Sequence, residues 1–159
     1  MRHGRRLGID VGDVRIGVAS CDPSGMIATP VETVKAGPGA IDRLVDIAEE
    51  YEVIECVVGL PMGLSGREGP AAKKVRVFVA ALAEALAQRP ATESAQIRLF
   101  DERMSTMTAQ AQLRSSGRSS KSSRSVVDQV AATVILQTAL DAERQRGTAP
   151  GEPVPRGLT

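Results

Sequence analysis

The stretch LGIDVGDVRIGVASC, residues 7–21, contains two short apolar runs separated by turn-forming Gly and Asp residues. Successive side chains of a strand point to opposite faces, so the first run separates its large apolar side chains from its small and acidic ones. One face carries Leu7, Ile9 and Val11, and the other carries Gly8, Asp10 and Gly12. The pattern predicts two strands in a hairpin, followed by a weaker third strand in MIATPVETV, residues 26–34.

Helical and extended patterns alternate over the rest of the chain. Apolar residues at helical spacing predict helices at 40–51, 69–88, 105–117 and 126–145. Continuous apolar runs predict strands at 53–61 and 97–100, the first of them covered on both faces. This order favours one α/β domain over residues 1–146, with three layers around a central mixed sheet. The Pro- and Gly-rich segment 147–159 is predicted to be a disordered tail.

Composition excludes several classes of protein. The 159 residues suffice for one domain with its own core, and a net charge of +1 means that any basic site has to be local. One Tyr, two Phe and no Trp disfavour a surface that stacks single-stranded bases on aromatic rings. No signal peptide or run of membrane-spanning length is visible, and Cys21 and Cys56 lie in apolar, strand-like contexts. We therefore expect a soluble, cytoplasmic protein with two buried thiols and no disulfide.

Three acids occupy positions where a carboxylate is costly unless it is paired or binds a metal. Asp10 ends the first apolar run, and Glu102 closely follows the run IRLF. Asp128 lies in a helical pattern whose same-face neighbours are apolar, namely Ala131, Ala132 and Ile135. Acids that converge from two strand ends and a helix form an all-oxygen site, which suits Mg²⁺ or Mn²⁺.

Each acid also has a plainer explanation. Gly and Asp residues are common in hairpin turns, although Asp10 still belongs to the strand pattern. Ser125 and Asp128 stand three residues apart and could form only a helix cap. Asp101 could cap a helix or pair with a base, and either Asp101 or Glu102 could be the metal ligand. Glycines on both sides of Asp10 favour function, because they would let a phosphate backbone approach the carboxylate.

Candidate phosphate-binding segments lie in three places. The Gly-rich loop at 59–69 could expose backbone N–H groups to phosphates or simply connect a strand to a helix. Arg103 in DERMST, residues 101–106, lies beside two acids and is suited to clamp a phosphate. The Ser-rich segment 115–125 carries three basic residues without an acid, namely Arg118, Lys121 and Arg124. It could grip a phosphate backbone or be a solvated loop.

The GIDVG motif also resembles the phosphate-binding hairpin of actin-like and sugar-kinase ATPases. Those proteins need two lobes and a second Gly-rich phosphate loop to close around ATP. This chain is too short for two substantial lobes and has no clear copy of the second loop. ATPase activity is therefore disfavoured.

Four motifs in a fixed order resemble one family: GIDVG with RIGVA, VVGLP followed by Gly, DER-x-ST, and D-x-x-AA-x-x-IL. It is the YqgF or RuvX family, described both as candidate nucleases of precursor 16S ribosomal RNA and as resolvase-like. The resemblance extends from about Arg6 to Gln145. It implies an RNase H-like fold and a catalytic acid set at Asp10, Glu102 and Asp128.

The expected chemistry is metal-dependent cleavage of a phosphodiester bond. Two divalent ions, Mg²⁺ or Mn²⁺, about 3.5–4 Å apart, would bridge the scissile phosphate. One would activate a water, and the other would stabilise the leaving 3′ oxygen. Asp10 is the best candidate to bridge both ions, with Glu102 and Asp128 completing the coordination. Candidates to hold flanking phosphates are Arg15, Arg103, Arg118, Lys121 and Arg124.

Three functions are compatible with such a site. The first is an endonuclease that trims the 5′ end of precursor 16S ribosomal RNA. The second is a resolvase of four-way DNA junctions, which needs two sites related by a two-fold axis. The third is a nucleic-acid-binding assembly factor with vestigial acids, which three acids in costly positions disfavour. The chain has no heptad run or long apolar seam, so we expect a monomer or weak homodimer and favour precursor rRNA over branched DNA.

Overall fold

The structure is a computed structural model that describes residues 1–63, 65–104 and 120–155, with the backbone alone for 120–127. The described residues form a mixed sheet with the strand order β3-β2-β1-β4-β5-β6. The strands are β1 (Arg6–Val11), β2 (Arg15–Cys21), β3 (Ala28–Lys35), β4 (Glu55–Leu60), β5 (Gln96–Asp101) and β6 (Glu152–Pro153). β1, β2 and β3 form an antiparallel meander, β4 and β5 run parallel to β1, and β6 is antiparallel to β5.

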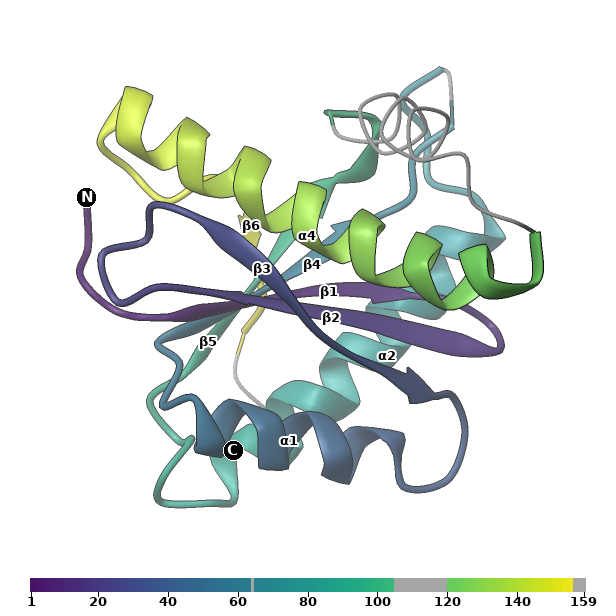
Figure 1. The fold of residues 1–159 in the computed structure, drawn as a ribbon, viewed down its shortest axis with the longest axis horizontal. Helices are drawn as coiled ribbons and strands as arrows, with labels where there is room; N and C mark the ends of the chain where they lie inside the picture. The colour runs from purple at the N-terminus through teal and green to yellow at the C-terminus, as the bar shows by residue number, and fades with distance from the viewer. Residues whose placement is uncertain (64, 105–119, 156–159) are drawn as a thin grey trace.

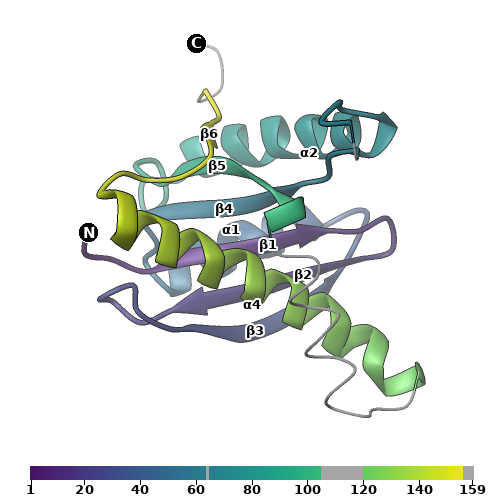
Figure 2. The ribbon, with the colours of Figure 1, turned by 90° about the horizontal axis from the view of Figure 1, so that it is seen from above.

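Helices cover both faces of this sheet (Figure 1). α1 (Ala40–Glu50) and α2 (Pro70–Ala87) contact each other against one face. α4 (Ser120–Arg146) crosses the other face, as the view from above shows (Figure 2). A 3-10 turn, η1 (Glu102–Met104), follows β5 directly. The predicted three-layer α/β architecture with a central mixed sheet is confirmed, whereas the helix predicted at 105–117 lies outside the described residues.

The larger core lies between the sheet and the α1–α2 layer. Leu7 and Ile9, on the predicted apolar face of β1, are both 0% exposed. β4 is buried along its whole length, as its continuous apolar run predicts. The helices contribute Leu44, Val45 and Ala48 from α1, and Val75, Val79, Leu82 and Leu86 from α2. Burial of these apolar stripes, rather than helix propensity, holds the two helices in place.

α4 lies close to the sheet because glycines beneath it carry no side chain. A Cβ added to Gly17 of β2 would lie 1.9 Å from the carbonyl oxygen of Asp128 in α4. A Cβ added to Gly8 of β1 would lie 2.6 Å from the carbonyl oxygen of Ala132. Both distances are below 3.0 Å, an approach that real Cβ atoms essentially never make. These two glycines therefore set the height of α4 above the sheet.

This close packing corrects a prediction about the glycines that flank Asp10. Gly8 is predicted from the sequence to admit a phosphate backbone, but it admits the backbone of α4 instead. Gly12 belongs to the hairpin turn, where its N–H donates to the carbonyl oxygen of Arg15 at 2.9 Å. Space above β1 is therefore used mainly to seat a helix.

The C-terminal segment corrects a second prediction. It is predicted to be disordered from residue 147, yet Glu152 and Pro153 form β6 and pair with β5. Arg76 of α2 donates to the Glu152 carboxylate at 2.8 Å and fixes the segment from the helix side. The free backbone groups of an edge strand readily accept such a partner, and composition alone does not reveal it. The sheet thus extends beyond residue 146, the boundary predicted for the domain, and residues 156–159 lie outside the described ones.

The start of the last helix corrects a third prediction. A Ser-rich loop is predicted up to residue 125, but α4 begins at Ser120. The moderate helix propensity of Ser is a weak prior that tertiary context overrides. Asp128 consequently lies well inside the helix, so the alternative that Ser125 and Asp128 only form a helix cap is wrong.

A buried ionic cluster anchors the C-terminal end of α4. Arg6 of β1 is 1% exposed and donates to Glu143 of α4 at 3.0 Å. Arg2 bridges Glu143 at 2.7 Å and Glu55 of β4 at 3.0 Å, and Arg98 of β5 also donates to Glu55. Burial alone would raise the pKa of Glu143, but hydrogen bonds from Arg2 outweigh it and lower the pKa to about 2. The cluster joins the N-terminal segment, three strands and α4 at the end of the sheet where β1 begins.

Two further predictions concern the cysteines and membrane-spanning segments. Cys21 and Cys56 are free and buried, as the sequence predicts. Burial raises the pKa of the Cys56 thiol to about 12, so the thiol stays protonated. Across the described ranges, none of the helices has the length and apolar character needed to cross a membrane.

Candidate metal and nucleic-acid site

Three elements bring the predicted acids to one end of the sheet. Asp10 lies near the end of β1, in register with Gly17 of β2. Glu102 opens the 3-10 turn that follows β5. Asp128 belongs to α4, and its carbonyl oxygen lies against Gly17. Because Gly17 pairs with Asp10 and also contacts the backbone of Asp128, it brings the helical acid beside the strand acid.

A third glycine, Gly59 of β4, lies between the strand that carries Asp10 and the turn that carries Glu102. A Cβ at Gly59 would lie 3.8 Å from the carboxyl carbon of Glu102 and 2.7 Å from the Cδ1 atom of Ile135 in α4. A side chain at this position would crowd Ile135 of α4 and lie in ordinary contact with the acid. Gly59 therefore lies directly beside both α4 and the Glu102 carboxyl group.

The Asp10 carboxyl group is partly buried, and its pKa is raised to about 7. Burial is the largest cause, followed by repulsion from Glu102 and then from Asp128. Burial also raises the pKa of Glu102, against the opposing effect of a side-chain hydrogen bond with Asp10. Two neighbouring carboxylates repel each other unless a proton, as in this hydrogen bond, or a cation lies between them. The pair therefore marks a place where positive charge is stabilised.

Asp128 has a different partner. Nε of Arg15 donates to Oδ2 of Asp128 at 2.8 Å. The two side chains are 36% and 19% exposed, respectively. Arg15 is the first residue of β2, so this ion pair joins the helix layer to the hairpin beside the site.

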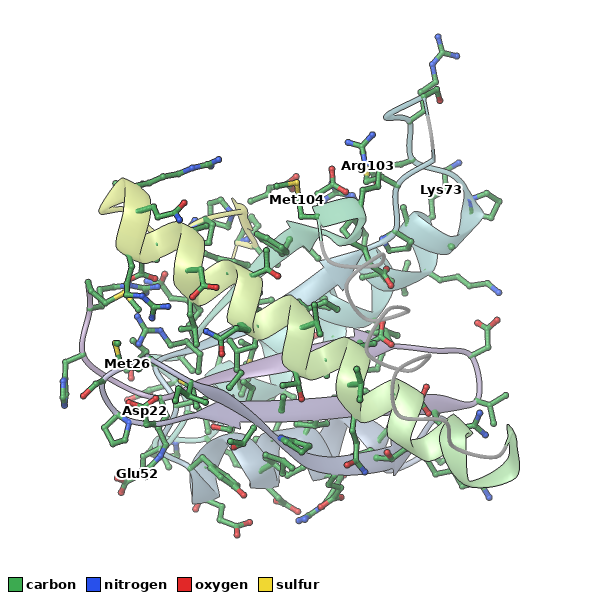
Figure 3. The ribbon with its side chains drawn as sticks, turned by 45° about the horizontal axis from the view of Figure 1, so that its top comes forward. Asp22, Met26, Glu52, Lys73, Arg103 and Met104 are labelled. Atoms are coloured by element: carbon green, nitrogen blue, oxygen red, sulfur yellow. The ribbon has the colours of Figure 1, made fainter. Side chains whose placement is uncertain are left out.

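Asp101 forms an ion pair with Arg103. The Arg103 guanidinium donates to both carboxylate oxygens, at 2.6 Å for Nη2 to Oδ2, and these hydrogen bonds lower the pKa of Asp101. Figure 3 shows Arg103 at the same end of the molecule as Lys73, which lies near the start of α2. Because Glu102, and not Asp101, shares a hydrogen bond with Asp10, the arrangement favours Glu102 as the metal ligand.

Within the described parts of the chain, no three His, Cys, Asp or Glu side chains stand close enough together to enclose a metal ion. Asp128 pairs with Arg15, while Asp10 and Glu102 hydrogen-bond to each other. The donors are nevertheless carboxylate oxygens, and every cause acting on the pKa of Asp10 raises it. The chemistry of the donor set fits a hard divalent cation.

A cleft of about 490 Å³ opens beside Glu102. Its walls are the β1–β2 turn, Pro61 after β4 and the first turns of α2. Lys74 of α2 lines the cleft, with its Nζ 3.6 Å from Oδ1 of Asp13 in the turn. Glu102 thus borders an open cleft that is also lined by the positively charged side chain of Lys74.

Comparison with known proteins identifies the family. The profile of the RuvX family, described as "Holliday junction resolvase", matches residues 4–142. The chain belongs to the RuvX family. The matched range runs from before β1 into α4 and includes Asp10, Glu102 and Asp128. The resemblance inferred from the four sequence motifs is confirmed.

Relatives of this RuvX chain are similar over nearly their whole length. A protein of Streptomyces avermitilis named "Putative pre-16S rRNA nuclease" is 58% identical over 156 residues, covering 97% of this chain and 96% of the relative. A protein of Thermobifida fusca with the same name is 48% identical over 159 residues, covering 96% of each.

Solved structures of RuvC share the fold of this RuvX chain. "T. thermophilus RuvC in complex with Holliday junction substrate" has a TM-score of 0.61 at 19% identity, covering 96% of this chain and 100% of that one. "Thermus thermophilus RuvC structure" has a TM-score of 0.57 at 17% identity, with coverages of 94% and 99%. The predicted RNase H-like fold is confirmed.

The structure brings some predicted site residues of this RuvX chain together and leaves others untested. Asp10 and Glu102 are hydrogen-bonded to each other, Asp128 interacts electrostatically with Asp10, and Arg15 contacts Asp128. Arg103 lies in the turn that carries Glu102 but pairs with Asp101. The remaining predicted phosphate ligands lie outside the residues whose side chains are described, namely Arg118, Lys121 and Arg124.

Sequence reasoning missed three residues that shape the site. Gly17 lies inside the strand pattern RIGVA, and a glycine in a strand interior often marks the close approach of another backbone. Gly59 gives the same signal within VVGLP, although the glycines that follow it favour a loop. Lys74 carries no distinctive signal, because a lysine in the first turns of a helix is usually a solvated residue.

Proposed function

We propose that this chain is a metal-dependent endonuclease that trims the 5′ end of precursor 16S ribosomal RNA during ribosome biogenesis in the cytoplasm. The observation that carries the proposal is the hydrogen-bonded pair of Asp10 and Glu102, with Asp128 close enough to raise the pKa of Asp10. Carboxyl groups with raised pKa values, here Asp10 and Glu102, beside a cleft that Glu102 lines are typical of functional sites. The name shared by the relatives supports precursor 16S rRNA as the substrate.

Asp10, Glu102 and Asp128 would hold Mg²⁺ or Mn²⁺, and two ions are expected. Such ions lower the pKa of a bound water and neutralise charge on a scissile phosphate. Asp10 would provide the most firmly placed ligand, because it lies in β1 between two neighbouring strands. Glu102 and Asp128 would approach from η1 and α4 on either side of it.

The other residues of the site would hold and orient the RNA backbone. Arg15 and Arg103, each next to one of the acids, would hold phosphates that flank the cut. Lys74, on the far wall of the cleft, would add a further cation near Glu102. Arg118, Lys121 and Arg124 would hold further phosphates of the RNA backbone.

The alternative function, a resolvase of four-way DNA junctions, is favoured by the family's description and by the likeness in fold to RuvC. A resolvase has to cut two strands at symmetric positions, so it needs a stable dimer with two sites. We propose a monomer or weak homodimer, which suits a single incision in RNA.

The first prediction separates these functions. We expect the protein to cleave a precursor 16S rRNA fragment at its 5′ leader in Mg²⁺ or Mn²⁺, and to sediment as a monomer or weak dimer at micromolar concentration. Gel assays on the RNA and on a four-way DNA junction, with analytical ultracentrifugation of the same preparation, measure both properties. A tight dimer that makes paired, symmetric nicks in the junction and leaves the RNA intact would reverse the preference.

The second prediction concerns the basic segment. Replacing Arg118, Lys121 and Arg124 together by Ala should weaken RNA binding and reduce the slope of log affinity against log salt by up to about three phosphate contacts. Metal affinity should stay unchanged, because the acids are untouched. Fluorescence titrations of labelled RNA between 50 and 200 mM salt measure the slope, roughly the range over which such contacts respond. An unaltered slope would show that the segment does not contact the backbone.

A further inference from the structure

We propose that Arg15 is the internal counter-ion of Asp128 when no metal is bound. A divalent cation has to displace Arg15 from Asp128, so metal loading releases the guanidinium for a substrate phosphate. The inference rests on the proposed nuclease function and goes beyond it. It assigns Arg15 two successive partners and predicts that metal and RNA bind in a coupled way.

The first ground is the contact itself. Nε of Arg15 lies 2.8 Å from Oδ2 of Asp128, a short, charge-assisted hydrogen bond. Asp128 is only 19% exposed, so its carboxylate is largely removed from water and depends on a partner. Arg15 supplies that partner.

The second ground is that the three acids have different partners. Asp10 and Glu102 hydrogen-bond to each other, and Asp128 bonds to Arg15 instead of joining them. A divalent cation shared by all three would have to draw Asp128 away from Arg15, because the cation repels the guanidinium and competes for the same carboxylate.

The third ground is the position of Arg15 in the β1–β2 hairpin. Its backbone is fixed: it pairs with Lys35 of β3, and its carbonyl accepts the N–H of Gly12. Gly12 and the neighbouring Asp13 line the cleft beside Glu102. Only the side chain is therefore free to exchange partners, and it extends from the same hairpin that forms a wall of the cleft.

Calorimetric titration with Mn²⁺ tests the displacement directly. Arg15→Gln should bind Mn²⁺ about three- to tenfold more tightly than the wild-type protein, because no guanidinium competes for Asp128. Without metal, the melting temperature of the same variant should fall by a few degrees, because Asp128 loses its partner. Arg15→Lys keeps a cation that can reach Asp128, so both values should stay near those of the wild type.

Lys74→Gln is the matched control for long-range charge. It removes one positive charge from the cleft beside Glu102, but Lys74 pairs with Asp13 and not with a predicted metal ligand. The Mn²⁺ affinity of Lys74→Gln should stay within about twofold of wild type at 0.15 M salt, where exposed charges are screened.

With precursor RNA as the substrate, Arg15→Gln should raise KM more than it lowers kcat.

The outcomes separate this inference from the proposed function. If wild-type protein binds Mn²⁺ but folded Arg15→Gln binds it equally or more weakly, Arg15 only supports the site and the inference fails alone. Equal tightening in Lys74→Gln would also overturn it, since general charge would then explain the effect. If the wild-type protein binds no Mn²⁺, the proposed metal-dependent function fails, and the inference fails with it.

Discussion

Asp10→Asn is expected to reduce metal-dependent cleavage by about a thousandfold or more while the protein stays folded. Asn is nearly isosteric with Asp but brings no negative charge to a metal, so the central ligand of the proposed site is lost. Initial rates on precursor RNA in Mn²⁺, together with circular dichroism of the purified variant, measure the two properties. Full activity in a folded Asp10→Asn protein would remove Asp10 from the site.

The same variant should be more stable than the wild type when metal is absent, and the difference should depend on pH. The pKa of Asp10 is about 7 in the folded protein against an ordinary value of 3.8, so the folded state retains the proton more strongly than the unfolded chain. Ionisation therefore destabilises the wild-type fold progressively as pH rises from about 4 through 7, and Asn escapes this loss. Thermal melts in EDTA at pH 4 and pH 8 should show a gain for Asp10→Asn only at the higher pH.

Gly17→Ala is expected to destabilise the protein by about 3 kcal/mol or more. The new Cβ would lie 1.9 Å from the carbonyl oxygen of Asp128, so α4 has to lift from the sheet and carry Asp128 away from Asp10. Cleavage should fall as well, because one acid is misplaced. Urea unfolding followed by circular dichroism gives the free energy of unfolding.

Gly69→Ala provides the control for the loss of a glycine as such. A Cβ at Gly69 meets nothing within 4 Å, and the residue does not require a positive φ. Its stability should change by no more than about 1 kcal/mol, the scale of an N-cap substitution. If Gly17→Ala proves as stable as this control, the close seating of α4 on β2 is not needed for the fold.

Local patterns predicted the layers of the fold. The period of two in β1 and β2 and the helical spacing in α1 and α2 report which side chains face a core, and the burial of Leu7 and Leu82 agrees. The candidate acids could be selected for a related reason. A carboxylate at the end of an apolar strand, such as Asp10, conflicts with its local surroundings, and this conflict is visible without knowledge of the fold.

The remaining features depend on contacts between distant segments. Arg15 and Asp128 are 113 residues apart in the chain, and the local sequence around either residue does not predict their ion pair. Gly17 signals that some backbone comes close, but its sequence neighbours do not reveal that this backbone is α4. The order of the segment that contains Glu152 likewise depends on the edge of β5 and on Arg76, which its Pro- and Gly-rich composition cannot indicate.

β6 also has a consequence for association between copies of the chain. An open strand edge is a template on which other chains can aggregate, and β6 covers β5 at Arg98 and Leu99. Pro153 has no N–H to offer a further strand, so the same two residues close the edge of β5 and discourage growth of the sheet. A protein truncated at residue 146 would lose this cover together with the Arg76–Glu152 ion pair. Such a truncation would expose an adhesive edge rather than remove a dispensable extension.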